Sequence, residues 1–499
     1  EQGVTLILTV DCGISNQKEI AQARSMGMEV IVTDHHEPPP GFVPMDAMGA
    51  MDRAAAQPAG FLALNAKRPD SRYPFRDLAG VGIAYKLAMA LSQHLSGAKR
   101  VSDEFRRFLL DATGLVALGT IADVVPLRGE NRLLASCGLE ALSRSLDAGI
   151  QALRQVTRLD KQPLTVRDIG FRLGPLLNAA GRMDDDRNAE LAARLLLTED
   201  RKEAQRLAET LDALNQKRRN EEKKVFDALQ EKIQSPAYPR EKAILEAGED
   251  WHPGVIGIVA SRLAESFHRP TLLVAWEKSL PGAGGGGKGR GSGRSVPDFP
   301  GLHLALKACS AHLLSYGGHA QAGGFSIQRE NWEKFRQAFQ DYLSQVPDLS
   351  LQDARPVWYD AGLALDEITS DLVKDLAKLE PHGEGNPTPL FLSPPVTCQG
   401  YKTFKEEKHL EFWAKGFRGV IFNAAHGLRP KPSDPPRPLQ LLFSPRKNTW
   451  RGGDHAIELI VTDMRLEAAS GPVPAPVPCH GPGPLPAGPG PASRQETPS

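Results

Sequence analysis

The segment VTLILTVDCGISNQKEIAQARSMGMEVIVTDHH, from Val4 to His36, carries the pattern from which the fold class is predicted. It begins with the apolar run Val4–Val10 and ends with a second apolar run, Met28–Thr33, and both are typical of buried strands. The residues between them have the composition of a helix, so the stretch predicts a strand, a helix and a second strand. Two strands joined by such a crossover run parallel in one sheet. We therefore expect an α/β fold.

The helix of this unit has a predicted beginning and a predicted end. Ser15 is a candidate N-cap, because its side-chain oxygen can accept a hydrogen bond from a backbone N–H of the first turn. Gly27 is a candidate for the position just after the helix, where a left-handed backbone favours glycine. The helix is thus predicted to occupy the segment NQKEIAQARSM.

Polar side chains follow both predicted strands. Asp11 comes directly after the first strand, and Asp34, His35 and His36 come directly after the second. Ligands of open α/β sheets gather at the carboxyl ends of the strands, and neighbouring strands lie about 4.8 Å apart, so one ion can reach a side chain from each. Carboxylates mixed with imidazole suit Mn²⁺ or Mg²⁺ better than a structural zinc. In the alternative interpretation, Asp11 caps the following helix and the histidines line a polar loop.

Asp123 is a single acid in the otherwise apolar stretch GTIADVVPL. Acids are rarely buried unless they are paired or bind a metal, although an aspartate that caps a helix would give the same pattern. Together with Asp11 and His35, Asp123 would give one metal several protein ligands.

Length and composition exclude several classes of protein. A chain of 499 residues is expected to form about three domains. Lys+Arg and Asp+Glu both number 60, so any nucleic-acid binding depends on local basic patches. The five cysteines are far apart and form no C-x-x-C pair, which argues against a zinc ribbon or a disulfide framework and fits a reducing cytosol. No apolar run is long enough to span a membrane.

The pattern along the chain predicts five segments. Residues 199–235 consist almost wholly of helix formers and predict one long connecting helix, and a new α/β unit begins with KAILEAG. Short alternating strands predict a small β-barrel, and the Pro/Gly-rich tail cannot build a core and is predicted to be disordered. The predicted segments are 1–198, 199–235, 236–345, 355–467 and 468–499.

Three glycine-rich stretches carry candidate phosphate-binding residues. GPLLNAAGRMDD places Asn178 and Arg182 beside small residues, and Arg182 could hold a phosphate, although a surface arginine in a turn is equally compatible. GKGRGSGRS and YGGHAQAGG are predicted to be loops whose backbone N–H groups face an anion, with Arg294, Ser295 and His319 as binding residues. For Gly282 to Gly287 a flexible linker is favoured.

The predicted barrel combines aromatic and basic residues, as barrels that stack bases over a basic groove do. The alternative is that most of these aromatic side chains belong to the core. The residues are Trp358, Tyr359, Phe412, Trp413, Lys402, Lys405 and Arg418.

Six motifs, in order, give the chain a family resemblance: TVDCGISN, VTDHHEPP, GTIADVVPL, GPLLNAAGRM, WHPGVIGIVASRL and YGGHAQAGGFSI. With PHGEGNPTPLF (Pro381 to Phe391), they resemble the RecJ single-stranded-DNA exonucleases of the DHH phosphoesterase superfamily, over residues 1 to 466. The resemblance implies a DHH domain, a DHHA1 domain and an OB-like barrel. It also implies a two-metal enzyme, using Mn²⁺ or Mg²⁺, that removes 5′-mononucleotides from single-stranded DNA in the 5′→3′ direction during DNA repair and recombination.

Residue roles follow from the same resemblance. Asp11 matches the aspartate expected to bridge both metals, and His35 and Asp123 match further ligands. His36 matches the histidine expected near the scissile phosphate, with Asp34 as its support. Arg182, Arg294 and His319 match positions expected to grip the DNA backbone. A monomer is expected, with single-stranded DNA as substrate and a RecQ-type helicase and a single-stranded-DNA-binding protein as candidate partners.

One part of the family pattern does not occur in the sequence. The first motif of the family, an acidic Asp-x-Asp-Gly segment, would lie before residue 1, so we expect a chain that is truncated at its N-terminus and holds an incomplete metal site. Two alternatives stay open at this point: a DHH enzyme acting on nano-RNA or cyclic dinucleotides, and a non-catalytic scaffold that binds single-stranded DNA.

Overall fold

The computed structural model describes residues 3–39, 42, 61–97, 100–183, 189–239, 241–277, 287–296, 299–346, 358–404, 409–422, 436–448 and 457–466. The chain forms two compact units. The first comprises Glu1–Arg355 together with Pro381–Pro387, and the second comprises Pro356–Glu380 together with Thr388–Ser499. Among the described residues, no helix combines the length and the apolar character needed to cross a membrane. The predicted disordered tail, 468–499, and the predicted linker, up to Gly286, lie outside the described residues.

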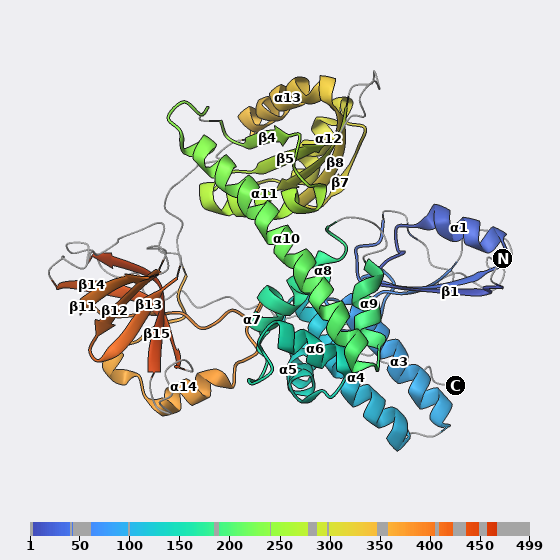
Figure 1. Cartoon of the computed structure of the whole chain (residues 1–499), viewed down its shortest axis with the longest axis horizontal. Coiled ribbons are helices and arrows are strands. Elements are labelled where there is room, and N and C mark those ends of the chain that lie inside the picture. The colour runs from blue at the N-terminus through green and yellow to red at the C-terminus, as the bar shows by residue number, and fades with distance from the viewer. Residues whose placement is uncertain are drawn as a thin grey trace, which may run out of the picture. The chain divides into compact units, whose positions relative to one another are not determined.

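The N-terminal sheet of the first unit is parallel, as predicted. Its strands are β1 (Leu6–Val10), β2 (Glu29–Thr33) and β3 (Leu62–Leu64), in that order, and α1 (Gln17–Ser25) connects the first two (Figure 1). In this register the last residues of β1 and β2, Val10 and Thr33, are partners, so both strands end at the same edge of the sheet.

The two predicted ends of α1 have different outcomes. Gly27 follows the helix with φ +86°, as predicted for a left-handed residue. The prediction of Ser15 as N-cap is wrong, because the N-cap is Asn16. Ser15 instead lies inside a tight turn that is closed by a 3.0 Å hydrogen bond from Asn16 N to Gly13 O.

One face of this sheet is covered and the other is open. Ile14, Ile20, Val30 and Val32 belong to the hydrophobic cluster on the covered face. The alternate side chains of the outer strands point the other way and are 41–56% exposed; they are Leu6, Leu8, Val10, Leu62 and Leu64. Parallel sheets usually bury both faces, and no part of the chain that the structure describes buries this one.

A helical core completes the first domain. It consists of α3 (Gly80–Ser96), α4 (Asp103–Ala122), α5 (Gly129–Arg144), α6 (Ala148–Val156), α7 (Val166–Asp168), the π-helical turn η2 (Ile169–Leu173), α8 (Gly174–Ala179) and α9 (Ala189–Leu197). Helix α4 ends at Ala122 and leaves Asp123 as its C-cap, which agrees with the helix-capping alternative for this aspartate.

The predicted connecting helix is α10 (Arg201–Gln234), with 34 residues and hence a length of about 51 Å. Its N-terminal half buries Leu207 and Leu211 against the helical core. Its C-terminal half buries Phe226 and Leu229 in a second cluster, together with α11 (Pro253–Phe267). The apolar stripe of α10 therefore contributes to two hydrophobic cores.

The second α/β domain is built on a sheet with the strand order β4-β5-β6-β8-β7. Its strands are β4 (Ile244–Gly248), β5 (Thr271–Trp276), β6 (Lys288–Arg294), β7 (Ser315–Gly318) and β8 (Ala322–Gln328), and its other helices are α12 (Leu302–Ala308), the short 3₁₀ turns η3 (Ser310–His312) and η4 (Arg329–Asn331), and α13 (Trp332–Gln345). Within this sheet, only β4 and β5 pair in parallel.

The glycine-rich stretches of this domain were predicted to be loops, and this prediction is wrong. KGRGSGR forms β6, the central strand, and YGG and AGGFSIQ form β7 and β8. The glycines are needed for close packing: a Cβ on Gly289 would lie 2.6 Å from Trp276, and one on Gly291 would lie 2.2 Å from Phe325. Large neighbours occupy the space that side chains would take.

The second unit is the predicted β-barrel. Strands β11 (Val396–Phe404), β12 (His409–Ala414), β13 (Phe417–Ile421), β15 (Ile457–Leu466) and β14 (Arg437–Lys447) pair in this order, and a β11–β14 pairing closes the barrel. The remaining elements are β9 (Ala361–Gly362), η5 (Leu365–Glu367), α14 (Ser370–Ala377) and β10 (Phe391–Leu392). The predicted order of an α/β domain, a connecting helix, a smaller α/β domain and a barrel is confirmed.

We predict that Gly138→Ala destabilises the helical core. A Cβ on Gly138 would lie 2.1 Å from the backbone oxygen of Thr113 and 2.4 Å from the Cβ of Ala117, where α5 crosses α4. Such overpacking costs about 1–3 kcal/mol, which would lower the urea midpoint of unfolding. Gly170→Ala is the matched control, because a Cβ on Gly170 meets nothing within 4 Å. Equal midpoints for the two variants would contradict the close α4–α5 crossing.

Candidate active site

Asp34 ties the ends of β1 and β2 together. Its carboxylate is buried and accepts hydrogen bonds from the backbone N–H of Ile14 at 2.9 Å, of His35 at 2.8 Å and of His36 at 3.2 Å. Burial by itself would raise the pKa of Asp34, but the hydrogen bonds from Ile14 and His36 outweigh it and hold that pKa below its usual value. The carboxylate is therefore charged, and it fixes the loops after both strands.

His36 is oriented by the same carboxylate. Its Nδ1 lies 2.7 Å from Oδ1 of Asp34, and its backbone oxygen accepts a 2.8 Å hydrogen bond from Asn65. The side chain is 53% exposed. With Nδ1 engaged, the Nε2 edge of the ring is the one left to act on a bound molecule.

His35 faces two carboxylates. Its Nε2 lies 3.2 Å from Oδ1 of Asp11 and 3.3 Å from Oδ2 of Asp123. Nε2 is buried and has no hydrogen-bond partner among the described residues, so the three side chains point at one spot without satisfying each other. Burial raises the pKa of Asp123; the charge on His35 opposes this shift, while the Asp11 carboxylate adds to it.

This arrangement fits a divalent cation. Two neighbouring ligand atoms of an octahedral ion with bonds of about 2.1 Å are about 3.0 Å apart, close to the two distances from Nε2 of His35. Mixed carboxylate and imidazole donors suit Mn²⁺ and Mg²⁺. Suitable donor atoms of Asp11, His35 and His36 also lie within 4.8 Å of one another. The residues present therefore match the predicted kind of metal.

Asp11 is held in an unusual position that the sequence alone did not indicate. Its φ is +62°, and its backbone N–H donates to Thr33 O at 2.9 Å. Its carboxylate rests on the first residue of α3, because a Cβ on Gly80 would lie 2.0 Å from Oδ1 of Asp11. Only glycine leaves room for the carboxylate there. The only indication in the sequence was a glycine at the start of an apolar stretch, in LAGVG.

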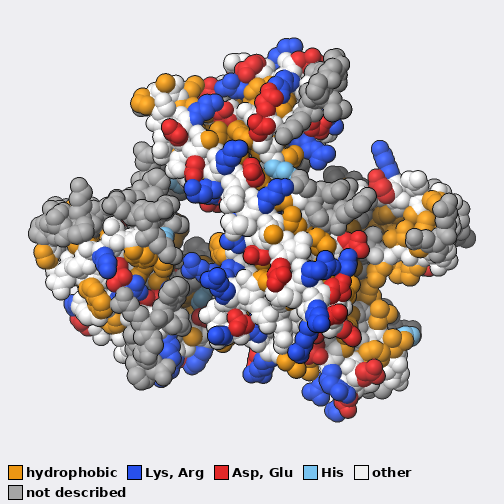
Figure 2. All heavy atoms as spheres, in the orientation of Figure 1, with side chains coloured by type: hydrophobic (Ala, Val, Ile, Leu, Met, Phe, Trp, Pro, Cys, Tyr) orange, Lys and Arg blue, Asp and Glu red, His pale blue; other side chains and the backbone are white. Residues whose placement is uncertain are grey.

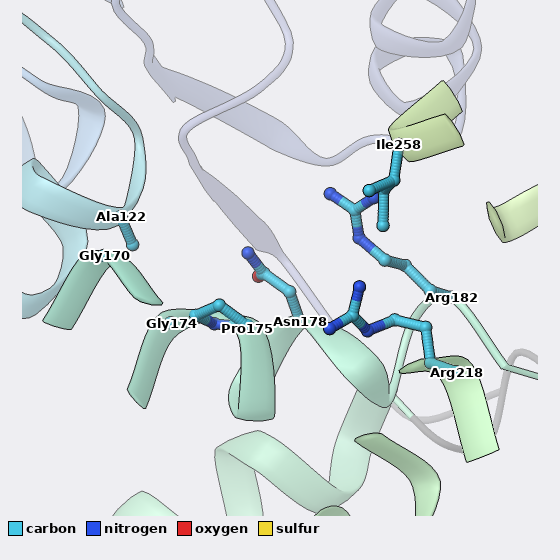
Figure 3. A pocket seen from close by; sticks show the side chains of 8 residues that line it. All are labelled: Ala122, Gly170, Gly174, Pro175, Asn178, Arg182, Arg218 and Ile258. Atoms are coloured by element: carbon cyan, nitrogen blue, oxygen red, sulfur yellow. The ribbon is translucent and has the colours of Figure 1, made fainter. Parts of the chain in front are cut away.

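A cavity of about 240 Å³ lies beside Ala122, the residue before Asp123. Asn178, Arg182 and Arg218 line one side of it, and Ala122 and Gly170 line the other (Figure 3). Two predicted residues, Asn178 and Arg182, therefore line a cavity that lies near Asp123.

Arg218 is a further cationic residue of this cavity that the sequence did not single out. It is nearly buried on α10, where Oδ1 of Asn215 accepts two hydrogen bonds from it and Glu222 pairs with it at 3.1 Å. Burial lowers the pKa of Arg218, and the charge of Arg182 contributes to the same shift, against the pairing with Glu222. The sequence pattern that could have identified Arg218 is a polar residue on the otherwise apolar face of a helix.

Arg294 is the second predicted arginine near Arg182. Burial and the charge of Arg182 both lower the pKa of Arg294. Its guanidinium donates to Oγ of Ser292 at 3.1 Å and to the carbonyl of Gly293. The predicted residue Ser295 instead donates its hydroxyl to the carbonyl of Val296, so Ser292 is the serine that contacts the arginine. Like charges held close together favour a bound anion.

His319 lies at the end of the sheet where Arg294 is found. Its backbone N–H donates to Ala322 O at 2.8 Å, and Ala322 is the strand partner of Arg294. The side chain of His319 is exposed and is not among the residues that line the cavity. The structure therefore brings it to the same sheet end without joining it to the cavity.

The barrel residues that were singled out divide into two groups. Phe412 is fully buried, whereas Trp413 is 42% and Trp358 75% exposed. Arg418 is paired with Glu411 and Glu458, both at 2.8 Å, and therefore stabilises the barrel. Lys405 lies outside the described residues. Basic and acidic side chains are interspersed over the visible face of the molecule, in keeping with the balanced composition (Figure 2).

Three family models match successive parts of the chain. They are the DHH family N-terminal domain over residues 3–120, the DHHA1 domain over residues 240–345, and the RecJ OB domain over residues 359–463.

Similar proteins cover most of the chain. The single-stranded-DNA-specific exonucleases RecJ of Dickeya dadantii and Escherichia coli are 35% and 34% identical to it, over 92% and 93% of the chain and 77% and 78% of their own lengths. The crystal structure of RecJ from Thermus thermophilus in complex with Mn²⁺ matches 93% of the chain with a TM-score of 0.74 and 32% identity. The chain spans 62% of that structure's length. The chain belongs to the RecJ family of single-stranded-DNA-specific exonucleases.

Proposed function

We propose that this chain acts on single-stranded DNA as a 5′→3′ exonuclease that releases 5′-mononucleotides with the help of two Mn²⁺ or Mg²⁺ ions. The observation that supports this most directly is the convergence of Asp11 and Asp123 on the unpartnered Nε2 of His35. Divalent ions bound at such a site activate water and stabilise negative charge on a phosphate.

The residues around the metal site have distinct proposed roles. Asp11, His35 and Asp123 hold the metal. Asp34 accepts the Nδ1–H of His36 at 2.7 Å and thereby fixes the orientation of the ring. Nε2 donates a hydrogen bond to an oxygen of the scissile phosphate when the ring carries both protons, because only the doubly protonated imidazole donates from both nitrogens.

The arginines are proposed to hold the substrate. Arg182 and Arg294 bind backbone phosphates, and Asn178 contributes a neutral hydrogen bond from the same cavity wall. Ser295 and His319 remain proposed DNA contacts at the end of the second sheet, with Ser292 as an added candidate because it touches Arg294.

The organisation of the whole protein is proposed to follow the same plan. Residues 1–198 form the DHH domain, 199–235 the connecting helix, 236–345 the DHHA1 domain and 355–467 the nucleic-acid-binding barrel. We propose that it works as a monomer in the cytoplasm, in DNA repair and recombination, with a RecQ-type helicase and a single-stranded-DNA-binding protein as partners. The match to the RecJ OB domain favours this function over a nano-RNA or cyclic-dinucleotide phosphodiesterase.

The direct test measures the binding of labelled DNA and the release of mononucleotides from it. The 499-residue chain is incubated in Mn²⁺ with 5′-labelled single-stranded DNA and with the matching duplex. We expect preferential binding of the single strand and slow release of labelled mononucleotide, because the family resemblance assigns further ligands to an acidic motif that these residues do not include. Asp123→Ala should abolish the release and keep the binding. Binding with no release, even at high protein concentration, would favour the non-catalytic scaffold for this chain.

We predict that substitution of His35 impairs metal binding, whereas substitution of His36 impairs catalysis. His35→Ala removes a proposed ligand and should weaken Mn²⁺ binding, measured by electron paramagnetic resonance titration, by at least about tenfold. His36→Ala should leave the Mn²⁺ affinity nearly unchanged and slow hydrolysis about 100-fold, the usual range for losing one donor to a developing charge. Equal losses of Mn²⁺ affinity in both variants would show that His36 is a ligand as well.

We predict that Arg182→Ala weakens the binding of single-stranded DNA about ten- to a hundredfold, because a charge-assisted hydrogen bond to phosphate is lost. The slope of log affinity against log salt should also fall by about 0.7. Fluorescence anisotropy at several salt concentrations measures both. Arg144→Ala is the control: its side chain is 78% exposed and pairs with Glu140 on α5. An unchanged salt slope for Arg182→Ala would argue against a phosphate contact.

A further inference from the structure

The motif PHGEGNP, Pro381–Pro387, has no role in the function proposed so far. It lies within the sequence of the barrel region, yet these seven residues belong to the first compact unit. The chain leaves the second unit after Glu380 and returns to it at Thr388. A short segment of this kind needs specific contacts to hold it on the other unit.

The segment forms a tight turn that is closed by its own hydrogen bonds. Gly383 N donates to Asn386 O at 2.9 Å, and Asn386 N donates back to Gly383 O at 3.1 Å. The side chain of Asn386 donates to Pro381 O at 2.9 Å, and Gly385 has φ +68°. The residue types of the motif therefore build one compact turn, which can act as a rigid piece.

The turn is docked on the loop that follows Asp123. Leu127 N donates to Glu384 O at 2.7 Å, and Nε of Arg128 donates to Gly385 O at 2.7 Å, across 257 residues of sequence. A Cβ on Gly383 would lie 2.7 Å from Cδ1 of Leu127, and one on Gly385 would lie 2.9 Å from Nε of Arg128. A side chain at either glycine would therefore force Leu127 or Arg128 to shift.

This loop needs support from outside. It runs from Asp123, the C-cap of α4, to Gly129, the first residue of α5. Val124, directly after Asp123, has φ +58° and is 66% exposed, which is a costly conformation for a β-branched residue. Its backbone N–H donates to Ile121 O at 3.2 Å, at the end of α4. The turn holds the far end of the same loop, where Leu127 is buried.

We propose that the Pro381–Pro387 turn is a positioning element of the metal site. By fixing the Val124–Arg128 loop, it keeps α4 from unwinding or extending at its end and so holds the Asp123 carboxylate toward His35. This inference rests on the proposed function, because it assigns the turn a role at the proposed metal ligands. It also explains why a motif so far away in the sequence contacts the loop through backbone atoms.

Gly385→Ala tests the proposal, with Gly416→Ala as matched control. Both glycines have positive φ, +68° and +83°, but a Cβ on Gly416 meets nothing within 4 Å. We expect Gly385→Ala to increase hydrogen–deuterium exchange over residues 119–131 and to weaken Mn²⁺ binding about tenfold or more, as the loss of a supporting contact does. The temperature at which the barrel unfolds should stay unchanged. Gly416→Ala should alter neither the exchange nor the affinity.

A second variant keeps the test valid if Gly385→Ala does not fold. Arg128→Ala removes only the side-chain bond to Gly385 O and should change exchange and affinity in the same direction by less. If exchange over 119–131 is unchanged in Gly385→Ala, the inference is wrong whatever the metal result. Failure of the unsubstituted chain to bind Mn²⁺ would contradict the proposed function instead, and the exchange comparison would still decide whether the turn holds the loop.

Discussion

The hydrogen bonds accepted by the buried carboxylate of Asp34 are the constraint on which the site depends. One oxygen takes the amide of Ile14, from the loop after β1, and the other takes the amides of His35 and His36, from the loop after β2. A charged group without water around it needs these donors, so the loops cannot separate without leaving the carboxylate unsatisfied. Asp34 thereby gives two adjacent histidines different surroundings: His35 faces carboxylates, whereas His36 faces outward.

The site divides its charge into two regions. Asp11 and Asp123 bring negative charge to the proposed metal site, while Arg182, Arg218 and Arg294 bring positive charge to the proposed phosphate site. The cavity lies beside the residue that precedes Asp123 and is lined by two of the arginines. Like charges repel within each region, and a bound metal and a bound phosphate would reduce this repulsion. The overall charge of zero conceals this separation, since it sums over regions of opposite sign.

The parts predicted correctly from sequence depend on local patterns. Apolar runs and the polar residues after them located β1, β2 and the group around His35, because the ends of parallel strands share one edge. The glycine-rich strands could not be predicted in this way. A glycine that avoids Trp276 or Phe325 looks the same in sequence as one that forms a flexible loop, and the difference lies in neighbours that only the fold brings together. Ser292 contacts Arg294 because residues two apart on one strand point to the same face, and Ser295 remains a predicted DNA contact.

The remaining site residues were missed because their role is to leave room or to act over long sequence distances. Gly80 matters only because the carboxylate of Asp11 occupies the space that its side chain would take. Gly385 matters only because the loop after Asp123 approaches it from a distant part of the sequence. Such glycines have no chemistry of their own, so a search for reactive side chains passes over them. Yet they set where the reactive carboxylates lie, and at a metal site a displacement of about half an ångström is enough to remove a ligand. The positions of the carboxylates at this site therefore depend on these glycines as well as on the carboxylates themselves.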